Sequence, residues 1–302
     1  MFTSYIKLAL RNIRRNMSYT VLNVVGLTLS LASCIVIFLI VKNELSYDRY
    51  HKKSDRTYRV TPNAIDFNPS VSMAVTVAMR NDFPELEHVA QFWYQGSGEV
   101  LLGESRFEEK GLAFADDQFT RIFDFKWLDG DKQSALSAPN SVVLTQTVAK
   151  KFFGNKEAMG QTFFNNGKQL KVTGIIDDLP GNTHFPFTWL VSFETIKNDL
   201  GGALREFYWI NGANTYIVIP ENFSIEQLQK KIPAFLKKNW GEGIAKEARL
   251  PMQPLKEIHF DQRYLHNIAM PTTSRNTYIA LAVVALFIII TACINFINLA
   301  TA

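Results

Sequence analysis

Two long apolar stretches without a charged residue constrain this chain of 302 residues more than any other feature. The first runs from Met17 to Val41 as MSYTVLNVVGLTLSLASCIVIFLIV, and the second covers residues 276–302. Roughly 20 apolar residues in a helix cross a bilayer core of about 30 Å. The two stretches therefore predict transmembrane helices at residues 17–41 and 277–302, with a large domain at residues 42–276 between them.

The distribution of charge predicts how these helices cross the membrane. The net charge is +4, and all 28 acidic residues lie between Glu44 and Asp261. The whole basic excess precedes the first apolar stretch, on Lys7, Arg11, Arg14 and Arg15. A neutral middle excludes a nucleic-acid-binding domain, which needs a basic face. Basic residues beside a membrane helix stay in the cytoplasm, so residues 42–276 are expected on the outer side of the membrane.

Residues 1–16 have the pattern of a helix that lies in the membrane interface. At 100° per residue, one face carries Phe2, Tyr5, Ile6, Ala9, Leu10 and Ile13. The four cations lie on the opposite face, where they would contact lipid headgroups. The alternative is a plain positive flank with accidental periodicity.

Small and amide residues within the apolar stretches suggest contacts between helices. Gly26, Ser30 and Cys34 recur every four residues, a spacing that lets helices approach closely, although chance explains it equally well. Amides in lipid seek partners, and antiparallel helices would place the amides of both stretches near the same membrane surface. The candidate helix-packing positions are Asn23, Gly26, Ser30, Asn295 and Asn298.

The cysteines leave one rival interpretation of the first stretch. Only Cys34 and Cys293 are present, one in each apolar stretch, so the domain between them has no disulfide. The sequence LASC at residues 31–34 resembles a lipoprotein cleavage box. The apolar run continues past that cysteine and is too long for a cleaved signal, so a permanent helix is favoured.

The middle of the chain predicts a mixed α+β domain. Strands are expected at 57–67, 89–94, 99–102, 105–115, 141–145 and 213–220, with helices at 70–83, 146–153 and 224–240. Gly103 is expected in a turn, Gly154 at a helix end, Asn166-Gly167 in a tight hairpin, and Ser224 with Gln227 in a capping box. The element order suggests two lobes, the second inserted into the first.

The sequence shows no motif of catalysis, cofactor binding or metal binding. FGNKEAMG has spaced glycines without the ending of a phosphate loop, and no Gly-x-Ser-x-Gly elbow occurs. The five histidines lack metal-ligand spacing. Asp177 and Asp178 are adjacent, which favours a solvated turn over an acid–base pair. We therefore expect no enzyme activity, no cofactor and no metal.

Four sets of residues resemble the MacB/FtsX-type permeases of ABC transporters, in the long-chain variety common in Bacteroidetes. They are YIKLALRNIRRN, ELSYDRYHKKSDRTYRV, VVLTQTVAKKFFGNKEAMGQTF with KVTGIIDDLPGNTHFPF, and LKEIHF followed by ACINFINLATA. The resemblance implies a protein of the bacterial inner membrane in which residues 42–276 form a periplasmic domain, with a Porter-like lobe and an inserted Sabre-like lobe. It also implies that ATP is bound by a separate subunit, and that the permease acts as a dimer by mechanotransmission.

The function expected from this resemblance is that of a permease subunit or fragment that exports or extracts lipoproteins, peptides or drugs. Its expected partners are an ABC ATPase subunit, a second permease in a homodimer or pair, membrane lipid, and a periplasmic adaptor or lipoprotein. The sequence ends within the second apolar stretch, so we expect it to be the first module of a longer protein. The alternative is a two-span sensor or binding protein with an extracytoplasmic ligand domain.

Overall fold

The computed structural model describes residues 11, 14, 15, 17–62, 68–207, 213–264 and 272–301, without the side chains of 298–301. It divides into two compact units. We call Met1–Ser46 with Ser274–Ala302 the helical pair, and Tyr47–Thr273 the outer domain. The domain boundaries expected after residues 16, 41 and 276 remain predictions.

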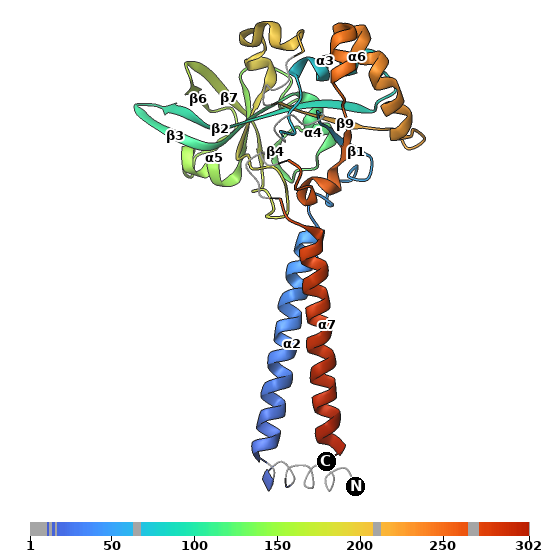
Figure 1. Cartoon of the computed structure of the whole chain (residues 1–302). Helices are drawn as coiled ribbons and strands as arrows, with labels where there is room; N and C mark the ends of the chain where they lie inside the picture. Colours follow the sequence, from blue (N-terminus) through green and yellow to red (C-terminus); the bar gives the residue numbers. More distant parts are fainter. Residues whose placement is uncertain are drawn as a thin grey trace. The chain divides into compact units, whose positions relative to one another are not determined.

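The described elements are, in chain order, those of a mixed α/β domain between two long helices (Figure 1). They are α2 (Met17–Leu45), β1 (Thr57–Val60), α3 (Met73–Asp82), β2 (His88–Leu102), β3 (Ser105–Ala115), α4 (Asp117–Ile122), β4 (Trp127–Gly130), β5 (Ser141–Thr145), α5 (Gln146–Phe153), β6 (Thr162–Asn165), β7 (Lys168–Ile176), β8 (Trp189–Ser192), the 3₁₀ helices η1 (Phe193–Thr195) and η2 (Lys197–Leu204), β9 (Ala213–Val218), α6 (Ile225–Glu247), β10 (Met252–Pro254), the 3₁₀ helix η3 (Leu255–Phe260) and α7 (Arg275–Thr301).

Helices α2 and α7 lie side by side and antiparallel (Figure 1). The Tyr278 hydroxyl donates to a carboxylate oxygen of Glu44 at 2.6 Å, where α2 ends and α7 begins. Both helices are long and apolar enough to cross a membrane, and most of their large apolar side chains are exposed. An apolar surface of this kind is stable in lipid rather than in water.

One sheet extends through the outer domain, in the order β10-β1-β9-β2-β3-β8-β5-β7-β4, with β6 paired to β2 and β7. The β3–β8 and β5–β7 pairs are parallel, and the other pairs are antiparallel. Strands β1, β9 and β10 come from the two ends of the domain, whereas β4 to β8 come from its middle. The strand order therefore shows the expected insertion, although both lobes share the sheet.

Three clusters of buried side chains form the core. One belongs to the segments from the domain ends and packs α3 and α6 on the sheet, including the contact of Phe83 with Phe235. A second packs β2, β3 and β5 to β8 against α5, around Trp189. The third lies between them and is rich in phenylalanine, including Phe119 and Phe185. The three clusters together form the core of one compact unit, and the third lies between the other two.

Several local predictions are confirmed. Asn166 and Gly167 have φ values of 48° and 79° and join β6 to β7 in a tight hairpin. Gly154, with φ of 63°, ends α5. The side chain of Gln227 accepts from the Ser224 backbone N–H at 3.4 Å in a capping box at the start of α6.

The prediction of two separate strands at 89–94 and 99–102 is wrong. Both are parts of one long strand, β2, because Gly96 forms a bulge at φ of 95° instead of a turn. The turn expected at Gly103 is present, with φ of 61°, and joins β2 to β3.

Helix α6 is longer than the prediction. It continues past the expected end at Trp240 to Glu247, with a break in helical geometry at Gly241. As at Gly96, a glycine distorts an element without ending it. Residues 63–67 of the first expected strand lie outside the described residues.

Candidate coupling site

The segment that follows α2 brings together three stretches that carry the family resemblance. Its first outer-domain residues, Tyr47 and Asp48, come from ELSYDRYHKKSDRTYRV. Asp48 contacts the sequence NTHF in the connection between β7 and β8, and Tyr47 contacts LKEIHF in η3. We call these contacts, which lie within the outer domain, the coupling site.

Asp48 is the centre of the first contact. It is fully buried and has a left-handed backbone, with φ of 55°, a conformation that Asp and Asn tolerate better than most residues. Its carboxylate accepts from the Thr183 hydroxyl at 2.9 Å and from the His184 backbone N–H at 3.2 Å. Its own N–H donates to the Asn182 carbonyl at 3.0 Å. Both the backbone and the side chain of Asp48 are therefore hydrogen-bonded to the β7–β8 connection.

A close approach of the Asp48 carboxylate to the His184 ring completes this contact. Asp48 Oδ2 lies 2.8 Å from His184 Nδ1, and both side chains are at most 2% exposed. Burial alone would raise the pKa of Asp48, but the charge and hydrogen bonds of His184 outweigh it, so the pKa lies below its ordinary value. Removing one partner of such a buried pair leaves an uncompensated charge and costs about 3–5 kcal/mol.

A row of buried polar side chains continues from His184 across the sheet. His184 Nε2 lies 2.8 Å from the Tyr216 hydroxyl. Tyr216 and Gln253 are the direct cross-strand neighbours of Arg59, on β9 and β10. Arg59 is fully buried, and two of its nitrogens donate to Gln253 Oε1 at 3.0 and 2.6 Å. The strand register thus aligns polar groups from Asp48 to the strand β10.

The second contact joins both ends of the outer domain to one residue. The Tyr47 and His259 rings stack with centroids 3.4 Å apart and planes 4° from parallel. The Thr273 backbone N–H donates to the His259 carbonyl at 2.9 Å. Tyr47 is the first residue of the domain and Thr273 the last. Both ends of the outer domain therefore contact η3 at His259.

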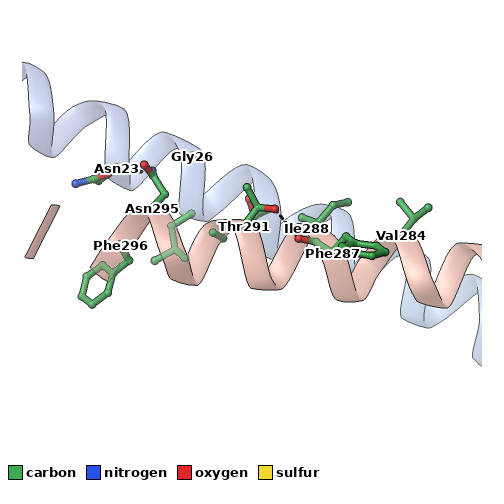
Figure 2. A pocket seen from close by; sticks show the side chains of 11 residues that line it. Asn23, Gly26, Val284, Phe287, Ile288, Thr291, Asn295 and Phe296 are labelled. Carbon is green, nitrogen blue, oxygen red and sulfur yellow. Dashed lines mark hydrogen bonds between the residues drawn. The ribbon is translucent and has the colours of Figure 1, made fainter. Parts of the chain in front are cut away.

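The candidate helix-packing residues that the structure describes lie together in the helical pair. Asn295 donates to the Asn23 side-chain oxygen at 3.4 Å. Gly26 and Ser30 line, with both asparagines, a groove of about 540 Å³ between the helices (Figure 2). The side chain of Asn298 lies outside the described residues. A helix-packing role for these positions remains a prediction.

The interfacial cations are described only in part, because Lys7 lies outside the described residues. Arg11, Arg14 and Arg15 are exposed and have helical backbone. Their contact with lipid remains a prediction.

The two adjacent acidic residues after β7 form ordinary surface contacts. Asp177 pairs with Lys126 at 2.8 Å, and Asp178 accepts from the Thr147 hydroxyl at 2.5 Å. Within the described part of the chain, no cluster of three or more His, Cys, Asp or Glu side chains could hold a metal ion.

The pairings at the coupling site were not predicted from the sequence. His184 and His259 were considered only as metal ligands, and Asp48 and Arg59 were not singled out. The available signal was that all four lie within the stretches that carry the family resemblance. Residues within one such stretch do not reveal which residue of another stretch they contact.

The fold and this site define a class of protein: a membrane protein in which two apolar helices flank a mixed α/β domain. Comparison with known proteins identifies the family. The family model of the MacB-like periplasmic core domain matches residues 20–235. The chain therefore belongs to that family, and its resemblance to MacB/FtsX-type ABC transporter permeases is confirmed.

Solved structures resemble part of this chain. A domain of a putative permease protein from Porphyromonas gingivalis shares the fold, with a TM-score of 0.57 at 18% identity, covering 68% of this chain and 91% of that one. The periplasmic region of MacB from Actinobacillus actinomycetemcomitans has a TM-score of 0.49 at 14% identity, covering 68% and 91%. The extracellular domain of the ABC-type transporter YknZ from Gram-positive bacteria has a TM-score of 0.45 at 15% identity, covering 65% and 99%. No match was found among curated protein sequences.

Proposed function

We propose that this permease carries ATP-driven motion from its membrane helices into the outer domain through the coupling site. The observation that carries the proposal is the attachment of both domain ends to His259. A domain whose two ends are joined to one element follows a displacement of either end. The buried pair of Asp48 and His184 strengthens this attachment. The segment after α2 cannot leave the outer domain without separating that pair.

The finer parts of the proposal come from the family resemblance and the charge pattern. The N-terminus lies in the cytoplasm, residues 42–276 lie in the periplasm, and a separate subunit hydrolyses ATP. The protein acts as a homodimer or with a second permease. The transported molecules are lipoproteins, peptides or drugs, handled on the periplasmic side.

A two-span sensor is the second candidate, because a domain joined at both ends can also carry a signal inward. The family match favours the transporter. The two functions differ in their partner: a permease binds an ATP-binding cassette subunit, and a sensor does not need one.

Copurification from membranes tests this difference. The protein is expressed from its natural gene with an affinity tag, together with the ATP-binding cassette subunits of the same organism, and is extracted in mild detergent. We expect one such subunit to copurify in a fixed ratio and its ATP hydrolysis to change on binding. Copurification of a kinase or cyclase in place of an ATP-binding cassette subunit would support the sensor instead.

A further inference from the structure

His51, in the segment after α2, makes a further buried contact. This contact has no part in the proposed transporter function. Its side chain is 2% exposed and lies against the rings of Tyr50, Phe123 and Phe125. Its Nδ1 accepts the backbone N–H of Asp124 at 3.0 Å. Because Nδ1 offers its lone pair to that bond, the proton of the neutral ring lies on Nε2, which is buried without a hydrogen-bond partner among the described residues.

This geometry accepts only the uncharged form of the ring. A proton on Nδ1 would face the N–H of Asp124, so two donors would meet where one bond is now made. The added charge would also lie among aromatic rings with Nε2 unpaired, which is costly in a buried place. The arrangement of atoms therefore opposes protonation.

The titratable groups that face His51 do not make its protonation favourable. They are Asp48 and Tyr50 on its own segment, Asp124 after α4, and His184 in the β7–β8 connection. Burial lowers the pKa of His51 from its ordinary 6.5 to about 4, despite the attraction of the two carboxylates and in concert with the repulsion of His184.

The hydrogen bond between His51 and Asp124 also joins two separate segments of the outer domain. Besides donating to His51, Asp124 makes a second hydrogen bond with the same segment, in which its Oδ2 accepts the Lys52 backbone N–H at 2.7 Å. His51 and Lys52 thus fasten the start of the outer domain to the connection between α4 and β4. Loss of the His51 bond would loosen the segment that also carries Tyr47 and Asp48.

We propose that His51 is an acid-sensitive pin, which fastens the segment after α2 to the α4–β4 connection while neutral and releases it when protonated. This inference goes beyond the transporter role and does not depend on it. It makes the attachment of the segment respond to the pH of the compartment that the outer domain faces.

The direction of the response follows from proton linkage. In the released state His51 is exposed and has its ordinary pKa, so between pH 6.5 and 4 the released state binds more protons than the fastened state. Release is therefore favoured as the pH falls through this range. Between about pH 7.5 and 5 the ratio of released to fastened molecules rises roughly 30-fold.

Hydrogen exchange of the whole protein in detergent micelles tests the pin. The readout is exchange at residues 123–125, corrected for the intrinsic pH dependence of exchange, in the wild type and in His51→Asn and His88→Asn variants. Asparagine places an uncharged acceptor near the position of Nδ1. His88 is a matched control, because it is a partly buried histidine whose Nδ1 lies 2.9 Å from Gln118 Oε1 instead of bonding the Asp124 backbone.

Comparison of the two variants distinguishes the effect of His51 on exchange from the effects of other titrating groups. We expect the roughly 30-fold rise in the wild type and in His88→Asn, and less than about a threefold change in His51→Asn. No rise in the wild type, or an unchanged rise in His51→Asn, would overturn the proposal.

Histidine NMR provides a second measurement if His51→Asn does not fold. The wild-type protein contains five histidines, so the ring signals of a ¹⁵N-histidine sample can be followed one by one from about pH 8 to 5. The pin requires one ring that is neutral at about pH 7 with its proton on Nε2 and that resists protonation well below its ordinary pKa of 6.5. Five rings that all titrate with ordinary pKa values would refute it.

Discussion

Asp48 and His184 lie 136 positions apart in the chain, yet Asp48 Oδ2 and His184 Nδ1 are 2.8 Å apart in the interior of the outer domain. Asp48 follows closely on the end of α2 at Leu45, and His184 lies between β7 and β8. The pair therefore joins the start of the domain to a loop from its middle. Its strength should be measurable in the stability of the domain.

A double-mutant cycle measures this pair. Asp48→Ala and His184→Ala should each lower the free energy of unfolding by about 3–5 kcal/mol, because each leaves a buried partner without compensation. The double variant should lose less than the sum, since no unpaired charge remains. Thermal unfolding followed by tryptophan fluorescence reports this, because all five tryptophans lie in the outer domain. Additive losses would show that the two side chains do not interact.

Stability should fall in acid in two separate ranges. His51 has a lowered pKa in the folded state, so its contribution is complete above pH 6.5 and declines as the pH falls towards 4, by about 3 kcal/mol in all. Asp48 also has a lowered pKa, and its contribution is lost only below its ordinary 3.8. Unfolding by urea at about pH 7.5, 5.5 and 4 tests the first range. An equal free energy of unfolding at all three pH values would contradict the claim that His51 is neutral in the folded protein.

Two glycines with similar backbone conformation should respond differently to alanine. A Cβ on Gly111 would clash with the Thr188 hydroxyl and lie 2.7 Å from its backbone nitrogen, whereas a Cβ on Gly103 meets nothing within 4 Å. Both have positive φ, so both variants carry the same backbone strain of about 1 kcal/mol. We expect Gly111→Ala to cost at least about 2 kcal/mol more than Gly103→Ala in the same unfolding assay. Equal costs would mean that β3 and the segment at Thr188 are not in close contact.

The orientation in the membrane should depend on the N-terminal cations. Replacing Lys7, Arg11, Arg14 and Arg15 with Glu removes the charges that hold the N-terminus in the cytoplasm. We expect an N-terminal reporter tag to become partly periplasmic, or insertion to fail. A matched variant with the same positions changed to the other basic residue should keep the wild-type topology. A tag that stays fully cytoplasmic in the Glu variant argues against the orientation.

Local structure was predictable where a few adjacent residues decide it. The Asn166-Gly167 turn, the Gly154 helix end and the Ser224–Gln227 capping box each depend on side chains within one turn of the backbone. The continuation of residues 89–94 into 99–102 as one strand was not predicted, because a glycine between two strand-like runs, here Gly96, fits a turn as well as a bulge. The distinction depends on whether β3 continues to pair beside it, which is a property of the sheet.

The coupling site was less predictable, because its contacts join distant parts of the chain. No periodicity links Tyr47 to His259, or Asp48 to His184. Arg59 lies in a short strand, where a charged side chain is more often exposed. It is buried because the register places Tyr216 and Gln253 directly opposite it, and the register is set by the pairing of β1 with β9 and β10.

Nucleotide-dependent hydrogen exchange tests the central claim, that the coupling site carries motion into the outer domain. The protein is reconstituted with its copurifying ATP-binding cassette subunit, and exchange at residues 47–51 and 255–260 is compared between the ATP-bound state and the nucleotide-free state. We expect a clear difference in the wild type and a much smaller one in Tyr47→Ala, with ATP hydrolysis retained. Identical exchange in both states of the wild type would contradict the account.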